Sequence, residues 1–269
     1  MKGSRFLIFF TLLLITLYLV IPIIAVLLFS ISDVWKPGEP FPSSYTAKWY
    51  LDTIDDPAVQ MAIVRSFIVG LITVIATLFL VTPTAYVIRL IFPQLESLMR
   101  LSTLLPFIMP GVIMALGLIQ IYSHPPIKIS GTIILLVFSY VSISLPLMYY
   151  SIANALDAID GKVLTEAAQS LGATIPETFF QVIFPNIIPG IISGSLLTFA
   201  SILGEFTLVN LLVGTRFKTL QMYLYIAINK EGHLTSALTV IYFVVVTIAS
   251  VIVLAVGRRV SKEQVASLH

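Results

Sequence analysis

The stretch Glu166-Ala-Ala-Gln-Ser-Leu-Gly172 is followed by residues 173–181 and then by Val182-Ile-Phe-Pro185. It is a long, helix-compatible polar interval in a chain that otherwise alternates apolar runs with short loops. Residues 163–171 are good helix formers, and Gly172 suits the left-handed position that closes a helix. The stretch therefore predicts a short helix that ends in a sharp corner.

Residues 174–177 predict the start of a second helix. The Thr174 hydroxyl can accept a hydrogen bond from a free backbone amide while Glu177 reaches back, which is a capping box. Pro176 lies in the first turn, where its missing N–H donor costs nothing. We therefore expect a helix, a corner and a second helix.

Each of these two helices carries an apolar strip, small on the first and bulky on the second. Small residues permit a partner to approach the backbone closely. The strips consist of Ala167, Ala168 and Leu171 on the first helix and of Phe179, Phe180 and Ile183 on the second.

The pattern Glu-Ala-Ala, three residues, Gly, nine residues and an aliphatic-x-aliphatic-Pro ending resembles the signature loop of permease subunits of binding-protein-dependent ABC importers. The resemblance implies that the loop, residues 157–185, is cytoplasmic and docks into a groove on a separate ATP-hydrolysing subunit. Val182 and Phe184 depart from the family pattern, which more often has Ile and Leu there. The alternative is an ordinary amphipathic surface loop between membrane helices. The residues to which the resemblance assigns ATPase coupling are Glu166, Ala167, Ala168, Leu171, Gly172 and Pro185.

Composition places the chain in a membrane. Of its 269 residues, 58% are hydrophobic and 10% are charged, and the mean hydropathy is +1.03. A water-soluble protein of this length would lack the polar surface to cover itself. The net charge of +2 gives no reason to expect a nucleic-acid partner, and the absence of cysteine excludes disulfides, thiol catalysis and Cys-based metal sites. We predict an all-α integral membrane protein in contact with lipid.

Six apolar runs predict six transmembrane helices in one permease domain, residues 1–269. The first run is too long for a signal peptide, so we expect an uncleaved helix that tolerates Pro22. The third contains Pro106, Pro110, Gly111 and Gly117, a density of helix breakers that favours a bent helix. The coupling loop lies between the fourth and fifth helices. The predicted spans are residues 6–31, 62–88, 101–122, 131–150, 187–213 and 235–256.

Two features concern the faces of the membrane. Trp35 and Trp49 lie in the long polar interval after the first span, where aromatic residues suit an interfacial anchor; a docking surface for a solute-binding protein is the alternative. Basic residues at both termini and at the turn between the second and third spans favour cytoplasmic termini, although the counts are close, eight inside against seven outside. The eight are Lys2, Arg5, Arg89, Arg100, Lys162, Arg258, Arg259 and Lys262.

The chain shows no catalytic site. Its Gly161-Lys162 pair lacks the other residues of a phosphate-binding loop, so the chain has no ATP-binding motif of its own. His124, His233 and His269 lack the spacing of metal ligands, and no Ser/His/acid set is visible. We therefore expect neither an enzyme nor a metal or cofactor site.

Glu205 is an acidic residue inside the fifth apolar run. A charge within the membrane is expensive and usually faces a partner or a watery cavity, so Glu205 and nearby Asn210 are candidates for the translocation pathway or its gate. A structural ion pair or an interfacial side chain that reaches the surface is the alternative. In permeases that the chain resembles, this part of the fifth helix helps to form a gate.

The resemblance implies a multi-pass subunit of a bacterial or archaeal plasma (inner) membrane that forms half of a solute pathway. Its implied partners are a dimer of ATP-binding cassette ATPases, which binds ATP and Mg²⁺, a second identical or different permease subunit, and an extracytoplasmic solute-binding protein. The long outer loop, the region of Tyr50 and the Gly-Glu-Phe stretch look most like the polyamine, iron and phosphonate branch. A polyamine is thus the expected solute, with iron, phosphonate or sugar as alternatives. An ion-coupled secondary transporter and a membrane-embedded enzyme remain open, although polar residues at mid-membrane are few.

Overall fold

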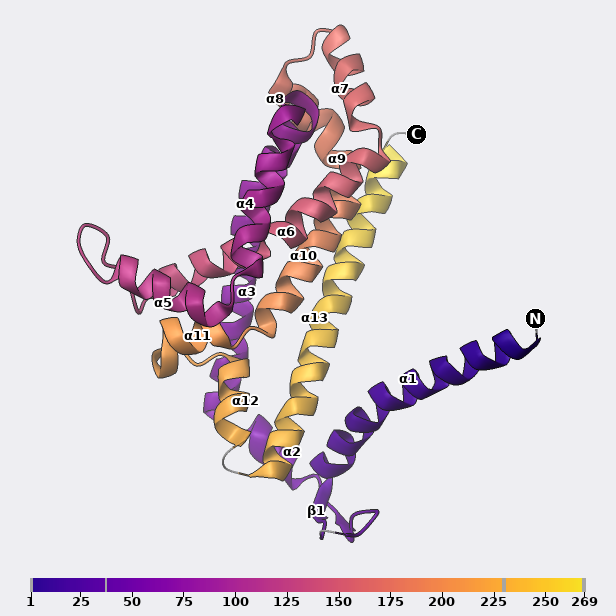
Figure 1. Cartoon of the computed structure of the whole chain (residues 1–269), viewed down its shortest axis with the longest axis vertical. Coiled ribbons are helices and arrows are strands. Elements are labelled where there is room, and N and C mark those ends of the chain that lie inside the picture. Colours follow the sequence, from indigo (N-terminus) through magenta and orange to yellow (C-terminus); the bar gives the residue numbers. More distant parts are fainter. Residues whose placement is uncertain (1, 37, 229–230, 268–269) are drawn as a thin grey trace. The chain divides into compact units, whose positions relative to one another are not determined.

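A computed structural model describes residues 2–36, 38–228 and 231–267, with the side chains of residues 2–6, 253 and 256–267 left undescribed. The described chain is almost entirely helical, which confirms the predicted all-α membrane class (Figure 1). Strands β1 (Ser32–Val34) and β2 (Ser44–Tyr45) add one short antiparallel pair. The helices are α1 (Lys2–Ser30), α2 (Lys48–Ile54), α3 (Pro57–Tyr86), η1 (Val87–Ile91), η2 (Pro93–Leu95), α4 (Glu96–Ile108), α5 (Gly111–Tyr122), α6 (Ile133–Ala158), α7 (Gly161–Ser170), α8 (Ile175–Glu177), η3 (Thr178–Ile183), α9 (Phe184–Asn186), α10 (Ile188–Leu203), α11 (Thr207–Leu212), η4 (Gly214–Arg216), α12 (Leu220–Ile228) and α13 (Gly232–Ser267).

Four helical stretches of the described chain are long and apolar enough to cross a membrane. The number rises to six when each of two bent helix pairs is counted as one span, which is the number that the sequence predicts. The four stretches are Leu7–Ser30, Pro57–Ile91, Ile133–Ala158 and Gly232–Ile252.

The predicted third run, residues 101–122, is not one continuous helix. It divides into α4 and α5, whose axes differ by 99°. Met109 has an extended backbone (φ −65°, ψ 128°) and precedes Pro110, which caps α5. The ring of a proline pushes the preceding residue out of the helical region, so the chain turns here.

The predicted fifth run, residues 187–213, is also broken. Helix α10 ends at Leu203, and α11 begins only at Thr207. Glu205 therefore lies in the break between two helices, whereas the sequence suggested a position within one long helix. A second bend, of 71°, separates residues 175–186 from α10.

By its internal contacts the chain divides into two compact units. The first unit comprises Met1–Ala62 and Tyr223–Val245, and the second comprises Ile63–Met222 and Val246–His269. The single permease domain predicted for residues 1–269 stays a prediction.

Helices α6 and α10 pack side by side in the second unit (Figure 1). Two glycines of α10 make this possible. A Cβ atom on Gly190 would lie 2.4 Å from the Cβ of Ala155, and one on Gly194 would lie 2.8 Å from the sulfur of Met148. Both distances are shorter than real contacts, so larger residues would separate the helices.

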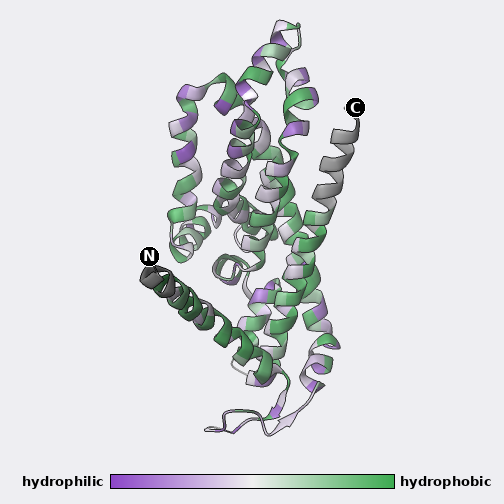
Figure 2. Cartoon of the chain, turned by 90° about the vertical axis from the view of Figure 1, so that its right-hand side faces the viewer, coloured by the Kyte–Doolittle hydropathy of each residue, from purple (hydrophilic) through white to green (hydrophobic). Residues whose placement is uncertain are grey.

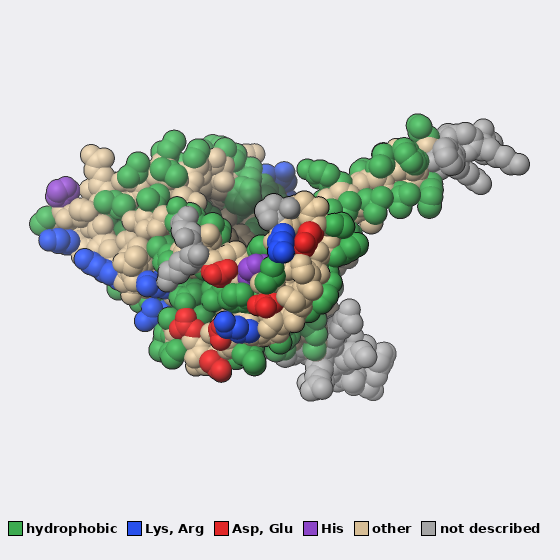
Figure 3. All heavy atoms as spheres, turned by 90° about the horizontal axis from the view of Figure 1, so that it is seen from below, with side chains coloured by type: hydrophobic (Ala, Val, Ile, Leu, Met, Phe, Trp, Pro, Cys, Tyr) green, Lys and Arg blue, Asp and Glu red, His purple; other side chains and the backbone are tan. Residues whose placement is uncertain are grey.

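Helix α1 belongs to the first unit and presents apolar side chains around its circumference. Its spanning stretch has a mean hydropathy of 3.0, and none of its most apolar window is buried within the described chain. Pro22 lies inside the helix, as the sequence predicts. Figure 2 colours the described part of α1 almost wholly as hydrophobic, and Figure 3 shows hydrophobic side chains along it. Such a surface suits contact with lipid or with another membrane helix.

Candidate functional site

The predicted corner after α7 has the geometry of a helix closed by a left-handed glycine. Gly172 has φ +92°. Its amide donates to the carbonyl of Gln169 (2.9 Å), and the amide of Ala173 donates to the carbonyl of Ala168 (3.1 Å). These are the two bonds of a Schellman motif, which satisfies the free carbonyls at the end of α7.

The predicted capping box is present at the start of α8. The Glu177 amide donates to the Thr174 hydroxyl oxygen (3.4 Å), and the Thr174 amide donates to Glu177 Oε2 (2.8 Å). The Thr174 hydroxyl also donates to this carboxylate at 2.7 Å. The bonds from the Thr174 amide and hydroxyl lower the pKa of Glu177, because they favour its charged form.

The segment after the capping box anchors the loop to the second unit. Thr178, Phe179 and Ile183 are buried, and the rings of Phe179 and Tyr86 lie 5.1 Å apart between centroids. Phe179 and Ile183 belong to a core cluster shared with α3, α6 and α10. Phe180, which the sequence groups with them, instead points outward and is 66% exposed. The bulky strip is thus divided between the core and the surface.

The outward face of α7 is apolar. Leu171 is 91% exposed, and Val163, two turns earlier on the same face, is 63% exposed. Ala167 lies between them, also exposed. The spacing of residues 163, 167 and 171 is the sequence signal for this face, and Val163 is an addition to the predicted coupling residues. Among the other predicted coupling residues, Glu166 and Gly172 are exposed, whereas Ala168 and Pro185 are half-buried.

Glu205 caps α11. Its Oε1 and Oε2 accept hydrogen bonds from the amide of Leu208 at 2.9 and 3.0 Å, and Oε2 accepts from the amide of Val209 at 3.3 Å. The carboxylate also interacts electrostatically with Tyr140 of α6. None of the ion pairs found among the described residues includes Glu205. Its charge is balanced by backbone dipoles.

Helix α11, whose first turn Glu205 caps, packs against α5 and α6. A Cβ atom on Gly111, the first residue of α5, would lie 3.3 Å from Cγ2 of Thr207. Asn210 lies one turn further along α11, half-buried, with its amide bonded to the Phe206 carbonyl at 2.9 Å. The structure therefore places Asn210 on α11 and Glu205 just before it, beside the break at Pro110.

Trp35 and Trp49 both belong to a polar and aromatic cluster of the first unit. The indole of Trp49 donates to the Ser32 carbonyl (2.8 Å) and stacks on His233 at 5.5 Å between centroids. His233 in turn stacks on Phe29 at 4.0 Å. Two of the three predicted non-ligand histidines, His124 and His233, are described; His269 lies outside the described residues.

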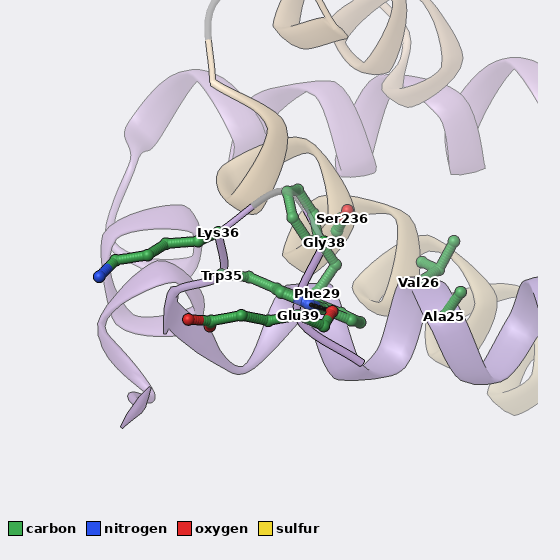
Figure 4. A pocket seen from close by; sticks show the side chains of 8 residues that line it. All are labelled: Ala25, Val26, Phe29, Trp35, Lys36, Gly38, Glu39 and Ser236. Atoms are coloured by element: carbon green, nitrogen blue, oxygen red, sulfur yellow. Dashed lines mark hydrogen bonds between the residues drawn. The ribbon is translucent and has the colours of Figure 1, made fainter. Parts of the chain in front are cut away.

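A cavity of about 620 Å³ adjoins this cluster. Its walls are largely apolar, from Val26, Phe29 and Trp35, and the charged ends of Lys36 and Glu39 extend away from it (Figure 4). Both interpretations of the tryptophans, an interfacial anchor and a docking surface for a solute-binding protein, stay predictions.

Asp56 links the start of α3 to α12 within the first unit. Its carboxylate accepts from the Ala58 amide at 2.8 Å and from the Tyr223 hydroxyl. Burial, together with this bond to a carboxylate, raises the pKa of Tyr223 to about 12.

Apolar spanning helices and an exposed corner between α7 and α8 are the features that the comparison with known proteins has to explain. Residues 91–262, more than half of the chain, match the family described as "Binding-protein-dependent transport system inner membrane component". The chain belongs to this family and is therefore a multi-pass inner membrane protein, the non-catalytic membrane component of a transport system. The family resemblance stated from residues 166–185 is confirmed.

The chain is also similar to distant relatives from other transport systems. The chain is 30% identical to the spermidine/putrescine transport system permease protein PotB of Haemophilus influenzae over 166 residues, 55% of this chain and 56% of that protein. It is 26% identical to the molybdenum transport system permease protein ModB of Mycobacterium tuberculosis over 218 residues, 77% of this chain and 81% of that protein. The match to PotB of Escherichia coli K12 is 28% over 176 residues, 60% of this chain and 64% of that protein. The chain thus spans less than two thirds of the two PotB proteins.

Proposed function

We propose that the chain is the membrane-spanning subunit of an ABC importer, forms half of the translocation pathway and is moved by a separate ATPase seated on α7. The observation that supports this most directly is Leu171. An apolar side chain that is 91% exposed at a hydrogen-bonded corner is unfavourable in water and favours a protein partner.

The proposed coupling surface comprises the outward face of α7 and the corner at Gly172. Burial of Phe179 and Ile183 ties this surface to the core of the second unit, so a push on α7 would reach α10. The ATPase dimer would bind ATP and Mg²⁺, and α7 would face the cytoplasm together with both termini. The side chains of Lys2, Arg5, Arg258, Arg259 and Lys262, on which that orientation depends, lie outside the described residues.

The same proposal includes a second permease subunit and an extracytoplasmic solute-binding protein. Family membership argues against an ion-coupled secondary transporter, since the family name specifies dependence on a binding protein. For the solute, a polyamine follows the PotB relatives and a molybdenum compound follows ModB, whose match covers more of this chain. Glu205 gives no support to either solute, because its carboxylate already accepts hydrogen bonds from backbone amides.

The test is a complex reconstituted in liposomes from this chain, the second permease, the ATPase and the binding protein. We expect ATP hydrolysis to rise when the binding protein carries spermidine or molybdate, and Leu171→Asp to release the ATPase. Retention of the ATPase by Leu171→Asp, with full stimulation, would contradict the proposed coupling surface.

A further inference from the structure

Arg89 links the ends of three helices, α3, α4 and α6, near the start of α7. It lies in η1, the π-helical end of α3, and its Nη1 donates to the Glu96 carboxylate in the first turn of α4. Its Nε donates to Asp157 Oδ1 at 3.1 Å, and Nη2 donates to Asp157 Oδ2, in the last turn of α6. The planar guanidinium group of arginine carries several N–H donors and can bind two carboxylates at once, which the ammonium group of lysine cannot do with the same geometry.

The bridge is shielded on the α3 and α4 side. The side chains of Arg89 and Glu96 are about four-fifths buried, at 20% and 21% exposure, whereas Asp157 is 53% exposed. Glu96 also accepts from Arg100 Nε at 3.0 Å. Ion pairs in partly buried places are screened less by salt and are held in a defined geometry.

Asp157 lies at the turn that leads into α7. Its backbone carbonyl accepts the amide of Asp160 (3.1 Å), which has the left-handed φ of +49° and precedes α7. Asp is among the few residues other than glycine that adopt this conformation readily. The side chain of Asp157 thus holds Arg89 while its backbone fixes the direction in which α7 leaves α6.

Packing reinforces the same connection. A Cβ atom on Gly161, the first residue of α7, would lie 3.0 Å from the Leu156 carbonyl oxygen and 3.2 Å from Cδ1 of Leu90 in η1. A polar cavity of about 470 Å³ adjoins the bridge and is lined in part by Asp160 and Lys162. The start of α7 therefore packs directly against η1, and the polar cavity lies beside the charged groups.

We propose that Arg89 is a positioning residue that transmits the movement of α7 to α4, in addition to the connection from α7 through η3 and α9 to α10. The proposal rests on the proposed function. Helix α4 runs from this bridge to the break at Met109–Pro110, and the following α5 packs against α11, the helix that Glu205 caps. A displacement of Asp157 would thus reach the candidate gate through Arg89 and α4.

The test measures solute transported per ATP hydrolysed in the reconstituted complex. Asp157→Asn removes one charge at a half-exposed position and should fold, and we expect it to lower this ratio at least fivefold while ATPase binding stays within twofold of wild type. Arg89→Lys keeps the charge but loses the planar guanidinium group, so its ratio should lie between those of Asp157→Asn and the wild type. Arg89→Gln combined with Asp157→Asn should be no worse than the more impaired single variant, as for two residues of one interaction.

Arg100→Gln is the matched control, since Arg100 contacts Glu96, whereas the side chain of Asp157 contacts Arg89. It should keep the ratio within twofold of wild type. An unchanged ratio of solute transported to ATP hydrolysed in Asp157→Asn would overturn the proposal. The same holds if transport, thermal stability and assembly all fall together while that ratio stays unchanged, because Arg89 would then be a structural residue. Failure of the wild-type complex to hydrolyse ATP in response to its binding protein would instead refute the proposed function.

Discussion

The backbone amide of Ala173 donates a hydrogen bond of 3.1 Å to the carbonyl of Ala168, across Gly172. This bond forms only because Gly172 adopts φ +92°, a conformation that costs an L-residue roughly 1–2 kcal/mol. The direction of the chain between α7 and α8 thus depends on one residue without a side chain.

Substitution of Gly172 should uncouple the ATPase. Gly172→Pro cannot reach a positive φ, so we expect loss of solute-stimulated ATP hydrolysis, whereas Gly172→Ala should reduce it severalfold. The matched control is Gly214→Ala, because Gly214 also has a positive φ, of +60°, with nothing within 4 Å of its missing Cβ. Normal coupled hydrolysis in Gly172→Pro would show that the corner does not carry the coupling.

Leu171→Ala should weaken assembly without destabilising the subunit. Burial of a leucine side chain contributes about 1.5–3 kcal/mol, so its loss at the interface should raise the Kd for the ATPase roughly tenfold or more. Thermal unfolding of the subunit should not change, because the side chain is already exposed. Leu71→Ala, at an exposed position of α3, is the control for surface truncation and should leave the Kd unaltered. Equal Kd values for both variants would argue against docking at Leu171.

Glu205 can be tested by removing its charge and its cap separately. Glu205→Gln retains an acceptor for the amides of α11, and Glu205→Ala does not, so only the alanine variant should lose the roughly 0.5–2 kcal/mol of a helix cap. Thermal unfolding and transport, measured together, distinguish the roles. Reduced transport with intact assembly in Glu205→Gln would support a place in the pathway, and wild-type behaviour of that variant would leave Glu205 as a cap alone.

The orientation of the coupling loop is open to labelling, because the chain has no native cysteine. Gln169 and Ser43 are both exposed in the folded chain, so a difference in their labelling would report the side of the membrane on which each residue lies. We expect Gln169→Cys to react with an impermeant thiol reagent only after the membrane is opened and the ATPase is removed. Ser43→Cys should react in intact cells. Labelling of both from outside would contradict the six-span arrangement with cytoplasmic termini.

The capping box should weaken in acid. The folded pKa of Glu177 is lowered below that of a free carboxyl group, so its stabilisation is present above the unfolded pKa and disappears as the pH falls through the folded value. Hydrogen exchange of the Thr174 and Glu177 amides, corrected for intrinsic rates, should therefore show less protection below about pH 4. Glu177→Gln, which cannot titrate, is the control and should show no such step; a step of the same size would assign the effect to another group.

What the sequence predicts well here is local. The corner at Gly172 and the box of Thr174 and Glu177 involve residues within a turn of one another, so spacing alone reveals them. The helical breaks are different. Pro22, Pro83 and Pro146 remain inside helices, whereas the chain turns at Pro110. Tertiary packing decides which proline bends the chain, and sequence pattern does not report it.

The partners of Glu205 and Arg89 also depend on tertiary structure and not on local sequence pattern. The sequence identifies Glu205 as an unusual carboxylate. Its partners are amides three and four residues later, and they can be predicted only if the end of α10 at Leu203 is known. The Arg89–Asp157 bridge joins residues 68 apart in sequence, and no local pattern predicts it. From sequence, Arg89 is only a basic residue at a membrane face and thus a signal of topology.

The corner at Gly172 is assembled from hydrogen bonds between near neighbours, so it holds its shape before any partner arrives. Docking onto it would not have to order a flexible segment, and little conformational entropy would be lost on association. Movement driven by the ATPase would then displace a rigid lever instead of folding a loop. A preorganised contact of this kind favours association as a rigid body, with the same surface presented in every stage of the transport cycle.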